Sequence, residues 1–356
     1  MQPFVYSAEP QRVVFGAGSV QQLSEELDRL DVARALVLCT PGQRDLAQAL
    51  VARLGARAAG LFDEARMHVP IETARRAQAL AARLGADAAV AVGGGSTVGL
   101  GKAIALDSGL PIVAVPTTYA GSEMTSIFGL TEAGVKRTGR DARVRPRTVV
   151  YDPELTHGLA MDVSVASGLN AIAHAAEALY AADRNPVTDL MALEGVAAMG
   201  RALPALAAAG TAGAARVQAR EQALYAAWLC GTVLGSVSMA LHHKLCHTLG
   251  GSFDLPHAQT HAAVLPHALA YNASHAGAAM ARLAGALGAH SAAAGVFDLA
   301  QACGAPTSLR ALGLARADLD RVLDLALQNR YPNPRPLEPA ALRQLLEHAY
   351  EGVRPD

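Results

Sequence analysis

The stretch that decides the fold is Ala88-Ala89-Val90-Ala91-Val92-Gly93-Gly94-Gly95-Ser96-Thr97. An apolar run without alternation, residues 88–92, leads directly into three glycines and two hydroxyl side chains, and the helix-like residues 98–106 follow. This order places the glycines at a strand-to-helix turn of an α/β domain. At such a turn the glycines let the backbone approach an anion, and amide and hydroxyl groups donate hydrogen bonds to it. We therefore predict a dinucleotide site at Gly93, Gly94, Gly95, Ser96 and Thr97.

The glycine run departs from the two standard phosphate-binding fingerprints. A GxGxxG motif needs glycine where Val98 stands. A P-loop ending at Lys102 needs glycine in place of Ser96 and a hydroxyl residue in place of Ala103. The mismatch argues against a kinase or an ATPase, and it leaves a tight turn that needs positive φ as the alternative reading.

A second polar segment favours the dinucleotide reading over the simple turn. The apolar run at 112–115 is followed by Pro116, Thr117, Thr118 and Tyr119. Because the carboxyl ends of parallel strands meet at one edge of a sheet, these hydroxyl groups are expected beside the glycines. We therefore add Thr117, Thr118 and Tyr119 to the predicted cofactor site.

The two halves of the chain have different sequence patterns. Apolar runs also occur at 35–39 and 148–151, with helical spacing at 44–54 and 71–84, which predicts a doubly wound, Rossmann-like α/β domain over residues 1–155. After Asp152-Pro153 the apolar runs give way to alanine- and leucine-rich stretches. The residues expected to separate helices there are Pro186, Gly210, Gly213, Pro256, Pro266, Gly288 and Pro306. Residues 156–356 are therefore predicted to form an all-helical substrate and catalytic domain, with a ligand in a crevice next to it.

Composition narrows the class of partner. The 356 residues are 51% hydrophobic and 17% charged, and 30 basic against 31 acidic residues leave a net charge of -1. No global field attracts nucleic acid or an anionic membrane, so a small diffusible partner is expected. The four cysteines form no CxxC pair, the N-terminus has no signal-peptide pattern, and no apolar run of about 18 residues is evident. These features predict reduced thiols and a cytoplasmic location.

Seven of the 12 histidines lie between His242 and His275. His243 and His247 are four residues apart and share a helical face, and His257 and His261 repeat this spacing after a turn expected at Gly250-Gly251 and Pro256. With His174 they offer ligands for zinc or iron. However, a neutral amide, Asn170, stands four residues before His174. Three histidines can hold zinc without a carboxylate, and imidazoles can also donate protons or bind carboxylates without a metal, while each histidine taken singly is most often structural.

In this order the segments resemble the iron-containing alcohol dehydrogenase superfamily across essentially the whole chain, and within it the maleylacetate reductases. The resemblance rests on a GGGS turn at 93–96, a PTT segment at 116–118, Ser-Glu-x-Thr at 122–125 and Asp-Pro-x-Leu at 152–155. The family's four metal ligands fall on Asn170, His174, His243 and His257, and a further active-site histidine falls on His247. The resemblance also places Ser96, Thr97, Thr117, Thr118, Thr125 and Lys136 near the dinucleotide.

Three departures separate this chain from the metal-dependent members. Asn170 replaces the aspartate ligand, Gly99 replaces an acid that usually follows GGGS, and residues 119–121 shorten the loop after PTT. All three are features of maleylacetate reductases. The resemblance therefore implies a metal-free, commonly dimeric enzyme that uses NADH or NADPH to reduce the carbon–carbon double bond of maleylacetate, giving 3-oxoadipate in aromatic-compound degradation.

This reaction needs hydrogen-bond donors at a developing oxyanion and an acid that protonates carbon. His243, His247 and His257 are the candidates as a group. Asn170 and His174 are expected to hold a carboxylate or the carbonyl of the substrate, and Lys244 is expected to assist. Thr40 stands where an acid in some relatives binds the ribose 2′-hydroxyl, which predicts use of both NADH and NADPH. The alternatives are a metal-dependent alcohol or hydroxy-acid dehydrogenase, a lyase resembling 3-dehydroquinate synthase, and a non-catalytic cofactor-sensing module.

Overall fold

The computed structural model describes residues 4–132, 135–208, 213–328 and 331–356. The chain divides into two compact units. One is Ala8–Leu159, and the other is Ala160–Asp356 together with the N-terminal segment that ends at Ser7. The change of pattern was predicted after residue 155, with the N-terminal segment in the first unit.

The first unit is built on a six-stranded sheet in which every neighbouring pair is parallel. The spatial order is β1-β8-β5-β4-β2-β3. The strands are β1 Arg12–Phe15, β2 Ala35–Leu38, β3 Ala58–Phe62, β4 Ala88–Gly93, β5 Ile112–Pro116 and β8 Thr148–Tyr151. An antiparallel hairpin, β6 Ile127–Glu132 with β7 Val135–Arg140, stands apart from this sheet. The four predicted strands are confirmed, whereas β1, β3 and the hairpin were not predicted because their side chains are only partly buried.

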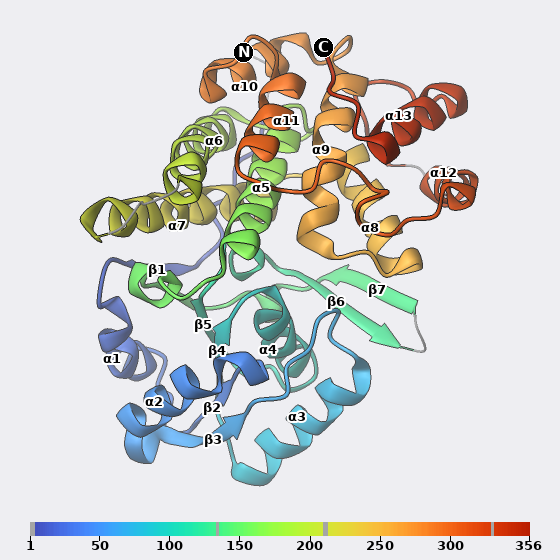
Figure 1. The fold of residues 1–356 in the computed structure, drawn as a ribbon. Helices are drawn as coiled ribbons and strands as arrows, with labels where there is room; N and C mark the ends of the chain where they lie inside the picture. The colour runs from blue at the N-terminus through green and yellow to red at the C-terminus, as the bar shows by residue number, and fades with distance from the viewer. Residues whose placement is uncertain (1–3, 133–134, 209–212, 329–330) are drawn as a thin grey trace. The chain divides into compact units, whose positions relative to one another are not determined.

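Helices cover both faces of the sheet (Figure 1). The four are α1 Leu23–Asp28, α2 Arg44–Leu54, α3 Ile71–Leu84 and α4 Gly95–Ser108. Side chains of α1 and α2 share a core with Val37 and Val90, while those of α3 and α4 share a second core with Leu36 and Ala89. Successive strand residues point to opposite faces, so buried cores on both sides explain the uninterrupted apolar runs.

The strand order creates a switch point at the centre of the sheet. From β2 the chain continues to β3 on one side, whereas from β4 it continues to β5 on the other, and β2 and β4 are hydrogen-bonded neighbours. Ligands of open α/β sheets bind outside the carboxyl ends of the strands at such a point. Thr40 follows β2 and Gly93 ends β4, so the topology brings both to this edge.

The second unit contains helices and no strand among its described residues, which confirms the predicted fold class. Its helices are α5 Met161–Ala178, α6 Pro186–Ala207, α7 Gly213–Ser236, α8 Leu241–Phe253, α9 His257–Asn272, α10 Gly277–Leu287, α11 Ala292–Ala302, α12 Leu319–Leu327 and α13 Pro339–Glu351. Within this unit α9 packs against both α5 and α8, as Figure 1 shows in green and orange. Helix α5 is buried along nearly its whole length, so its polar residues lie in the interior.

Two predicted breaks between helices are wrong: the turn at Gly250-Gly251 and the break at Pro266. Gly250 and Gly251 lie inside α8, and the chain turns instead at Asp254, which caps the helix in the left-handed conformation at φ 54°. Pro266 lies inside α9, where nearly every neighbour is buried and tertiary packing outweighs the lost hydrogen bond. Pro186 begins α6 and Gly288 caps α10 as expected, while Gly210 lies outside the described residues.

Two described helical stretches, Pro186–Ala207 and Gly277–Ala302, are long and apolar enough by length and composition to cross a membrane, but 44% of each tested window is buried inside the protein. A bent pair, α7 with α8, passes the same test together. These apolar surfaces serve helix packing, since α6 lies against α5, α7 and α10.

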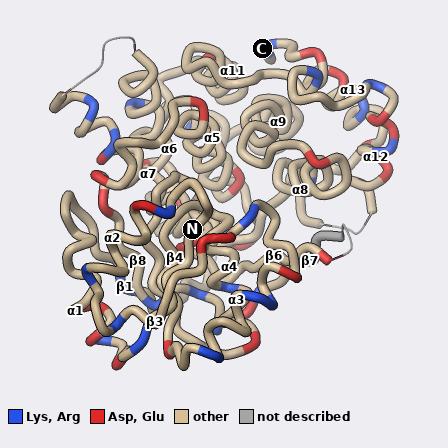
Figure 2. Tube along the Cα trace, turned by 60° about the horizontal axis from the view of Figure 1, so that its bottom comes forward, with Lys and Arg blue, Asp and Glu red and all other residues tan. Residues whose placement is uncertain are grey.

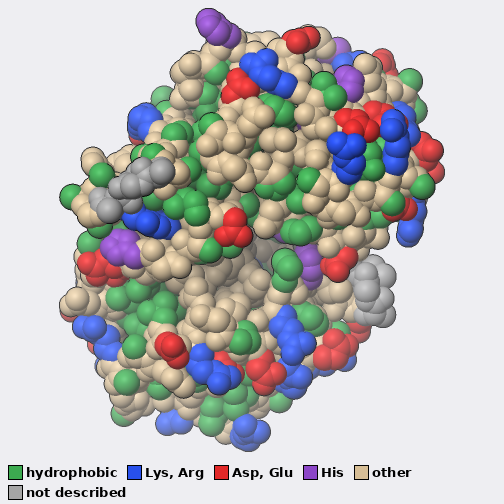
Figure 3. Space-filling view, viewed as in Figure 1, with side chains coloured by type: hydrophobic (Ala, Val, Ile, Leu, Met, Phe, Trp, Pro, Cys, Tyr) green, Lys and Arg blue, Asp and Glu red, His purple; other side chains and the backbone are tan. Residues whose placement is uncertain are grey.

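Charged residues of both signs are interspersed on the surfaces in view. Arg316, just before α12, and Arg343 of α13 both pair with Glu347, and blue and red segments alternate around these helices in Figure 2. The face drawn in Figure 3 mixes basic and acidic side chains in the same way.

Candidate functional site

The glycine run forms the predicted strand-to-helix turn. Gly93 ends β4 with φ 149°, a value that favours glycine, Gly94 is the N-cap, and α4 begins at Gly95. The first bonds of the helix run from the amides of Thr97 and Val98 to the carbonyl of Gly94. The amides of Gly95 and Ser96 precede them, so they occupy the first-turn positions that have no partner inside the helix. The turn thus presents N–H groups and the positive end of a helix dipole.

The side chains of Thr97 and Thr118 pack closely against this turn. A Cβ on Gly94 would lie 2.8 Å from Oγ1 of Thr118, and a Cβ on Gly93 would lie 2.5 Å from Oγ1 of Thr97. Only glycine fits at either position without movement of a neighbour. The hydroxyl of Thr97 is buried and has no protein partner among the described residues. A polar cradle with free donors at a helix N-terminus matches the needs of a dinucleotide pyrophosphate.

The ends of β2 and β5 are linked beside the turn. Nε2 of Gln43 donates to Oγ1 of Thr117 at 2.9 Å, and the amide of Thr117 donates to the carbonyl of Gly93 at 3.2 Å. Thr40 and Thr118 are half-buried and follow β2 and β5 at this edge. Gln43 was not predicted, and its place three residues after Thr40 in the turn following a strand was the available signal.

The loop after β5 is anchored by a buried cation. Nζ of Lys102 donates to the carbonyls of Ser122 and Ile127, both at 2.7 Å, and to Oγ1 of Thr125 at 2.9 Å. Burial lowers the pKa of Lys102 to about 7, against the raising influence of the Glu123 carboxylate. Thr125 therefore supports the loop rather than lining an open surface. Among the other predicted cofactor residues, Tyr119 is fully buried, and the side chain of Lys136 lies outside the described part of the structure.

The helical unit brings the predicted histidines together from three helices. His174 of α5 stacks on His243 of α8 with ring centroids 5.2 Å apart. His243 lies 6.1 Å from His247, and His247 stacks on His257 of α9 at 6.4 Å. His247 is exposed, His257 is half-buried, and the other two are buried. The cluster therefore has a rim that reaches solvent and an interior that does not.

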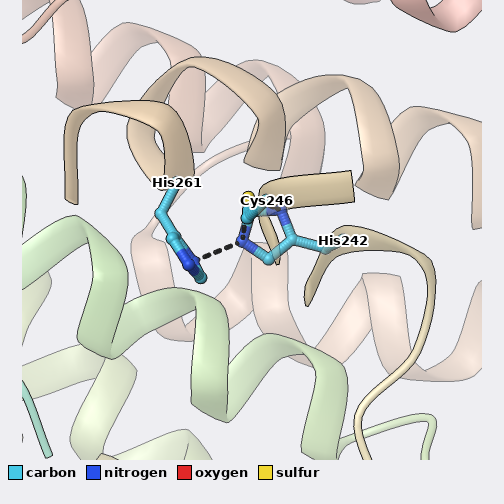
Figure 4. A group of neighbouring side chains, drawn as sticks. All are labelled: His242, Cys246 and His261. Carbon is cyan, nitrogen blue, oxygen red and sulfur yellow. Dashed lines mark hydrogen bonds between the residues drawn. The ribbon is translucent and has the colours of Figure 1, made fainter. Parts of the chain in front are cut away.

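Two further histidines complete the cluster: His261, considered above only as a possible metal ligand, and His242, which was given no role. His261 lies 4.5 Å from His257 and 5.1 Å from His243 between ring centroids. Behind it, Nε2 of His242 is 2.9 Å from Nδ1 of His261, a hydrogen bond drawn in Figure 4. Burial, followed by the neighbouring imidazoles, holds the pKa of His174, His242 and His261 well below its usual range. These three rings are therefore neutral at physiological pH.

A buried glutamate fixes the position of His243. Glu177 of α5 is fully buried, and its Oε2 accepts a hydrogen bond from Nδ1 of His243 at 2.7 Å. The same carboxylate accepts the backbone amides of Ala240 and His242 at 2.9 and 2.8 Å. Glu177 was missed in the sequence analysis, although it stands three residues after His174 and so shares its helical face.

Asn170 and Lys244 were predicted to contact the substrate. Asn170 is 4% exposed, and its Oδ1 is buried without a protein partner among the described residues. It lies one helical turn before His174, on the same face of α5. Lys244 is half-buried, with Nζ 6.0 Å from the centroid of the Tyr331 ring. An amide that is free to hydrogen-bond therefore accompanies the histidines, while Lys244 packs toward Tyr331.

Two family models cover both units of the chain. Residues 10–153 match the iron-containing alcohol dehydrogenase model, and residues 164–350 match the C-terminal model of the same family. The chain therefore belongs to the iron-containing alcohol dehydrogenase family, and it is an oxidoreductase. This membership sets aside both the lyase and the non-catalytic alternatives.

Three similar relatives are maleylacetate reductases. The chain is 62% identical over 355 residues, 100% of both chains, to the maleylacetate reductase of Burkholderia cepacia. The crystal structure of maleylacetate reductase from Agrobacterium tumefaciens is 55% identical over 100% of both chains, with a TM-score of 0.95. That of maleylacetate reductase from Rhizobium sp. strain MTP-10005 is 54% identical over 100% of both chains, with a TM-score of 0.94.

The family name implies iron, and the residues at the family's ligand positions fit a metal ion poorly. Asn170 supplies a neutral amide where a carboxylate would offset the charge of the ion. Ligands on one ion lie about 3 to 4 Å apart. Among the described residues, the group of three whose donor atoms all lie within 4.8 Å of one another is His242, Cys246 and His261, not His174, His243 and His257. In that buried group the hydrogen bond between the two imidazoles already explains the close approach.

Proposed function

We propose that this protein reduces the carbon–carbon double bond of maleylacetate with NADH or NADPH, giving 3-oxoadipate in the degradation of aromatic compounds. The observation that carries the proposal is the histidine cluster with Asn170 in the place of a metal-binding carboxylate. Imidazole and amide groups can donate hydrogen bonds to a dianionic substrate, whereas a carboxylate at position 170 would repel it. The names and full-length coverage of the relatives support the same substrate.

The α/β unit holds the dinucleotide in this proposal. The first-turn amides of α4, with Ser96 and Thr97, bind the pyrophosphate, and Thr118 contacts it from the end of β5. Thr40 contacts the adenosine ribose, and its neutral hydroxyl accepts both NADH and NADPH. When bound, the reduced nicotinamide supplies a hydride to the carbon β to the substrate carbonyl.

The helical unit supplies the remaining chemistry. Addition at the β carbon develops negative charge on the carbonyl oxygen, so donors aimed at that oxygen stabilise the transition state. His174 and the amide of Asn170 bind the substrate, and His243, His247 and His257 provide the donors and the proton that completes the reduction at the α carbon. Each proton lost is regained from water through the rim, where His247 is exposed.

We also propose that no metal takes part. The support is chemical: the ligand positions offer three imidazoles and an amide without a carboxylate, and the donor atoms of the three histidines do not converge. An iron-dependent alcohol dehydrogenase activity would need a closer set of donors.

One experiment tests both parts. Protein treated with a strong chelator is supplied with maleylacetate and NADH, or NADPH, and the loss of nicotinamide absorbance is followed. Full activity after chelation, with 3-oxoadipate as the product, is the expected result. A requirement for added iron or zinc would overturn the metal-free part, and failure to consume the cofactor with maleylacetate would overturn the substrate.

A further inference from the structure

Both carboxylate oxygens of Glu177 accept hydrogen bonds in the interior of the helical unit. Glu177 is 0% exposed, and both of its oxygens accept N–H groups: Oε1 from the backbone of His242, and Oε2 from the backbone of Ala240 and the ring of His243. Backbone amides can only donate, so the carboxylate acts as the acceptor on both sides. An acceptor facing Nδ1 of His243 requires that this nitrogen carries the hydrogen.

The hydrogen bond to Glu177 decides which ring nitrogen of His243 can transfer a proton. With Nδ1–H committed to Glu177, the other ring nitrogen, Nε2, is the one that can transfer a proton. Nε2 is buried and has no protein partner among the described residues. The ring stands among other histidines, 5.2 Å from His174 and 5.1 Å from His261 between centroids. A histidine with one nitrogen fixed by a carboxylate and the other free is the arrangement that general acid–base catalysis uses.

The same contact compensates charge. His243 is only 5% exposed, and a protonated imidazole at such a depth needs a nearby negative group. Glu177 provides it at 2.7 Å.

We infer that Glu177 is a positioning residue, which holds the ring of His243 by Nδ1 and leaves Nε2 to transfer a proton in the reaction. The inference rests on the proposed function. In the step, the π bond of the substrate breaks as its β carbon gains a hydride from NADH or NADPH, which would be oxidised to NAD+ or NADP+. The Nε2–H bond of His243 breaks, and its proton forms a C–H bond at the α carbon. The product gains two hydrogens, Glu177 stays a carboxylate throughout, and the neutral imidazole regains its proton from water.

The kinetic test compares four variants with the wild type. In Glu177→Gln one oxygen becomes an NH2 group that faces an N–H donor, so the ring of His243 is released and kcat falls on the order of 100-fold, while KM for maleylacetate changes little. Glu177→Asp keeps the negative charge, so its kcat is expected to lie between that of Glu177→Gln and that of the wild type. The kcat of His243→Gln falls at least as far as that of Glu177→Gln, and the kcat of His257→Gln falls less. Asp189→Asn removes another buried carboxylate of the same unit, one bound to Arg184 and Arg282, and leaves kcat near the wild-type value.

A second measurement keeps the inference testable if Glu177→Gln does not fold. Protein labelled with 15N-histidine reports which ring nitrogen carries hydrogen, and the signal of His243 is assigned by its loss in His243→Gln. Protonated Nδ1 is expected in the wild type. A bare Nδ1, or a wild-type kcat in folded Glu177→Gln, overturns the inference. Failure of wild-type enzyme to reduce maleylacetate overturns the proposed function instead, and the ring measurement still reports on the contact itself.

Discussion

Thr118 packs against the backbone of Gly94 so closely that a Cβ at this glycine would lie 2.8 Å from its Oγ1 and 2.9 Å from its Cγ2. Gly94→Ala therefore pushes Thr118 away from the helix N-terminus, and KM for NADH is expected to rise about 10-fold or more. Steady-state kinetics measure this, with Gly158→Ala as the control because its Cβ would meet nothing within 4 Å. An unchanged KM for NADH in Gly94→Ala would remove this turn from the cofactor site.

Asn170→Asp should convert the cluster toward a metal site. The buried Oδ1 of Asn170 has no protein partner among the described residues, so a carboxylate there is an uncompensated charge beside His174. We expect zinc or iron to raise the melting temperature of the variant, because an ion that binds only the folded state stabilises it. The wild type should show no such rise, and turnover of maleylacetate should fall in the variant. Stoichiometric metal in active wild-type protein, found by elemental analysis, would contradict the premise.

Lys102→Met tests the anchor of the loop after β5. The change removes all three hydrogen bonds of the ammonium group, although the carbonyl of Ser122 still accepts from the amide and the hydroxyl of Thr125. The free energy of unfolding is expected to fall on the order of 3 kcal/mol. Urea unfolding measures this, with Ser108→Ala near the other end of α4 as the control. A loss below about 0.5 kcal/mol would show that the loop does not depend on this cation.

Stability should fall in mild acid because buried histidines must bind protons to unfold. Burial, with His348 nearby, lowers the pKa of His267 to about 4. Between pH 6.5 and 4 the unfolded chain therefore binds a proton that the folded protein does not. The unfolding free energy falls as pH falls through this window, by about 1.4 kcal/mol per pH unit for this histidine, and its contribution levels off below the window. His174, His242 and His261 act in the same direction.

The variant His267→Gln isolates this contribution. The free energy of unfolding, measured by urea titration from pH 7 to 5, should depend less steeply on pH in the variant than in the wild type. The difference should correspond to the uptake of about one proton fewer on unfolding. The exposed His275→Gln is the matched control. Equal slopes in His267→Gln and the wild type would mean that His267 does not contribute.

Thr40→Asp tests the choice between cofactors. Thr40 is half-buried at the switch point of the sheet, where a carboxylate accepts a hydrogen bond from the ribose and repels a 2′-phosphate. The ratio of kcat/KM for NADPH to that for NADH should fall about 100-fold in the variant. In the wild type the two values should agree within about 100-fold, and a stronger preference for NADH would count against the role of this threonine.

Much of the α/β unit could be read from the sequence. The runs at 88–92 and 112–115 are apolar at every position because helices bury both faces of the sheet, and this leaves a pattern that no solvent-facing strand would have. Helices α2 and α3 begin and end at the predicted residues for a similar reason, since each has one buried face. Strand β3 and the hairpin were missed because partly buried strands lack this pattern.

The sequence by itself determined the fold class, the glycine turn at 93–95 and the gathering of histidines, because these depend on local periodicity and on spacing along the chain. Only the tertiary structure decided which groups meet across helices. Glu177 and His243 are 66 residues apart, and no spacing rule joins them; the packing of the interior brings Oε2 to within 2.7 Å of Nδ1. The same packing buries His174, His242 and His261 and keeps them neutral, and it places His243 against a carboxylate contributed by another helix.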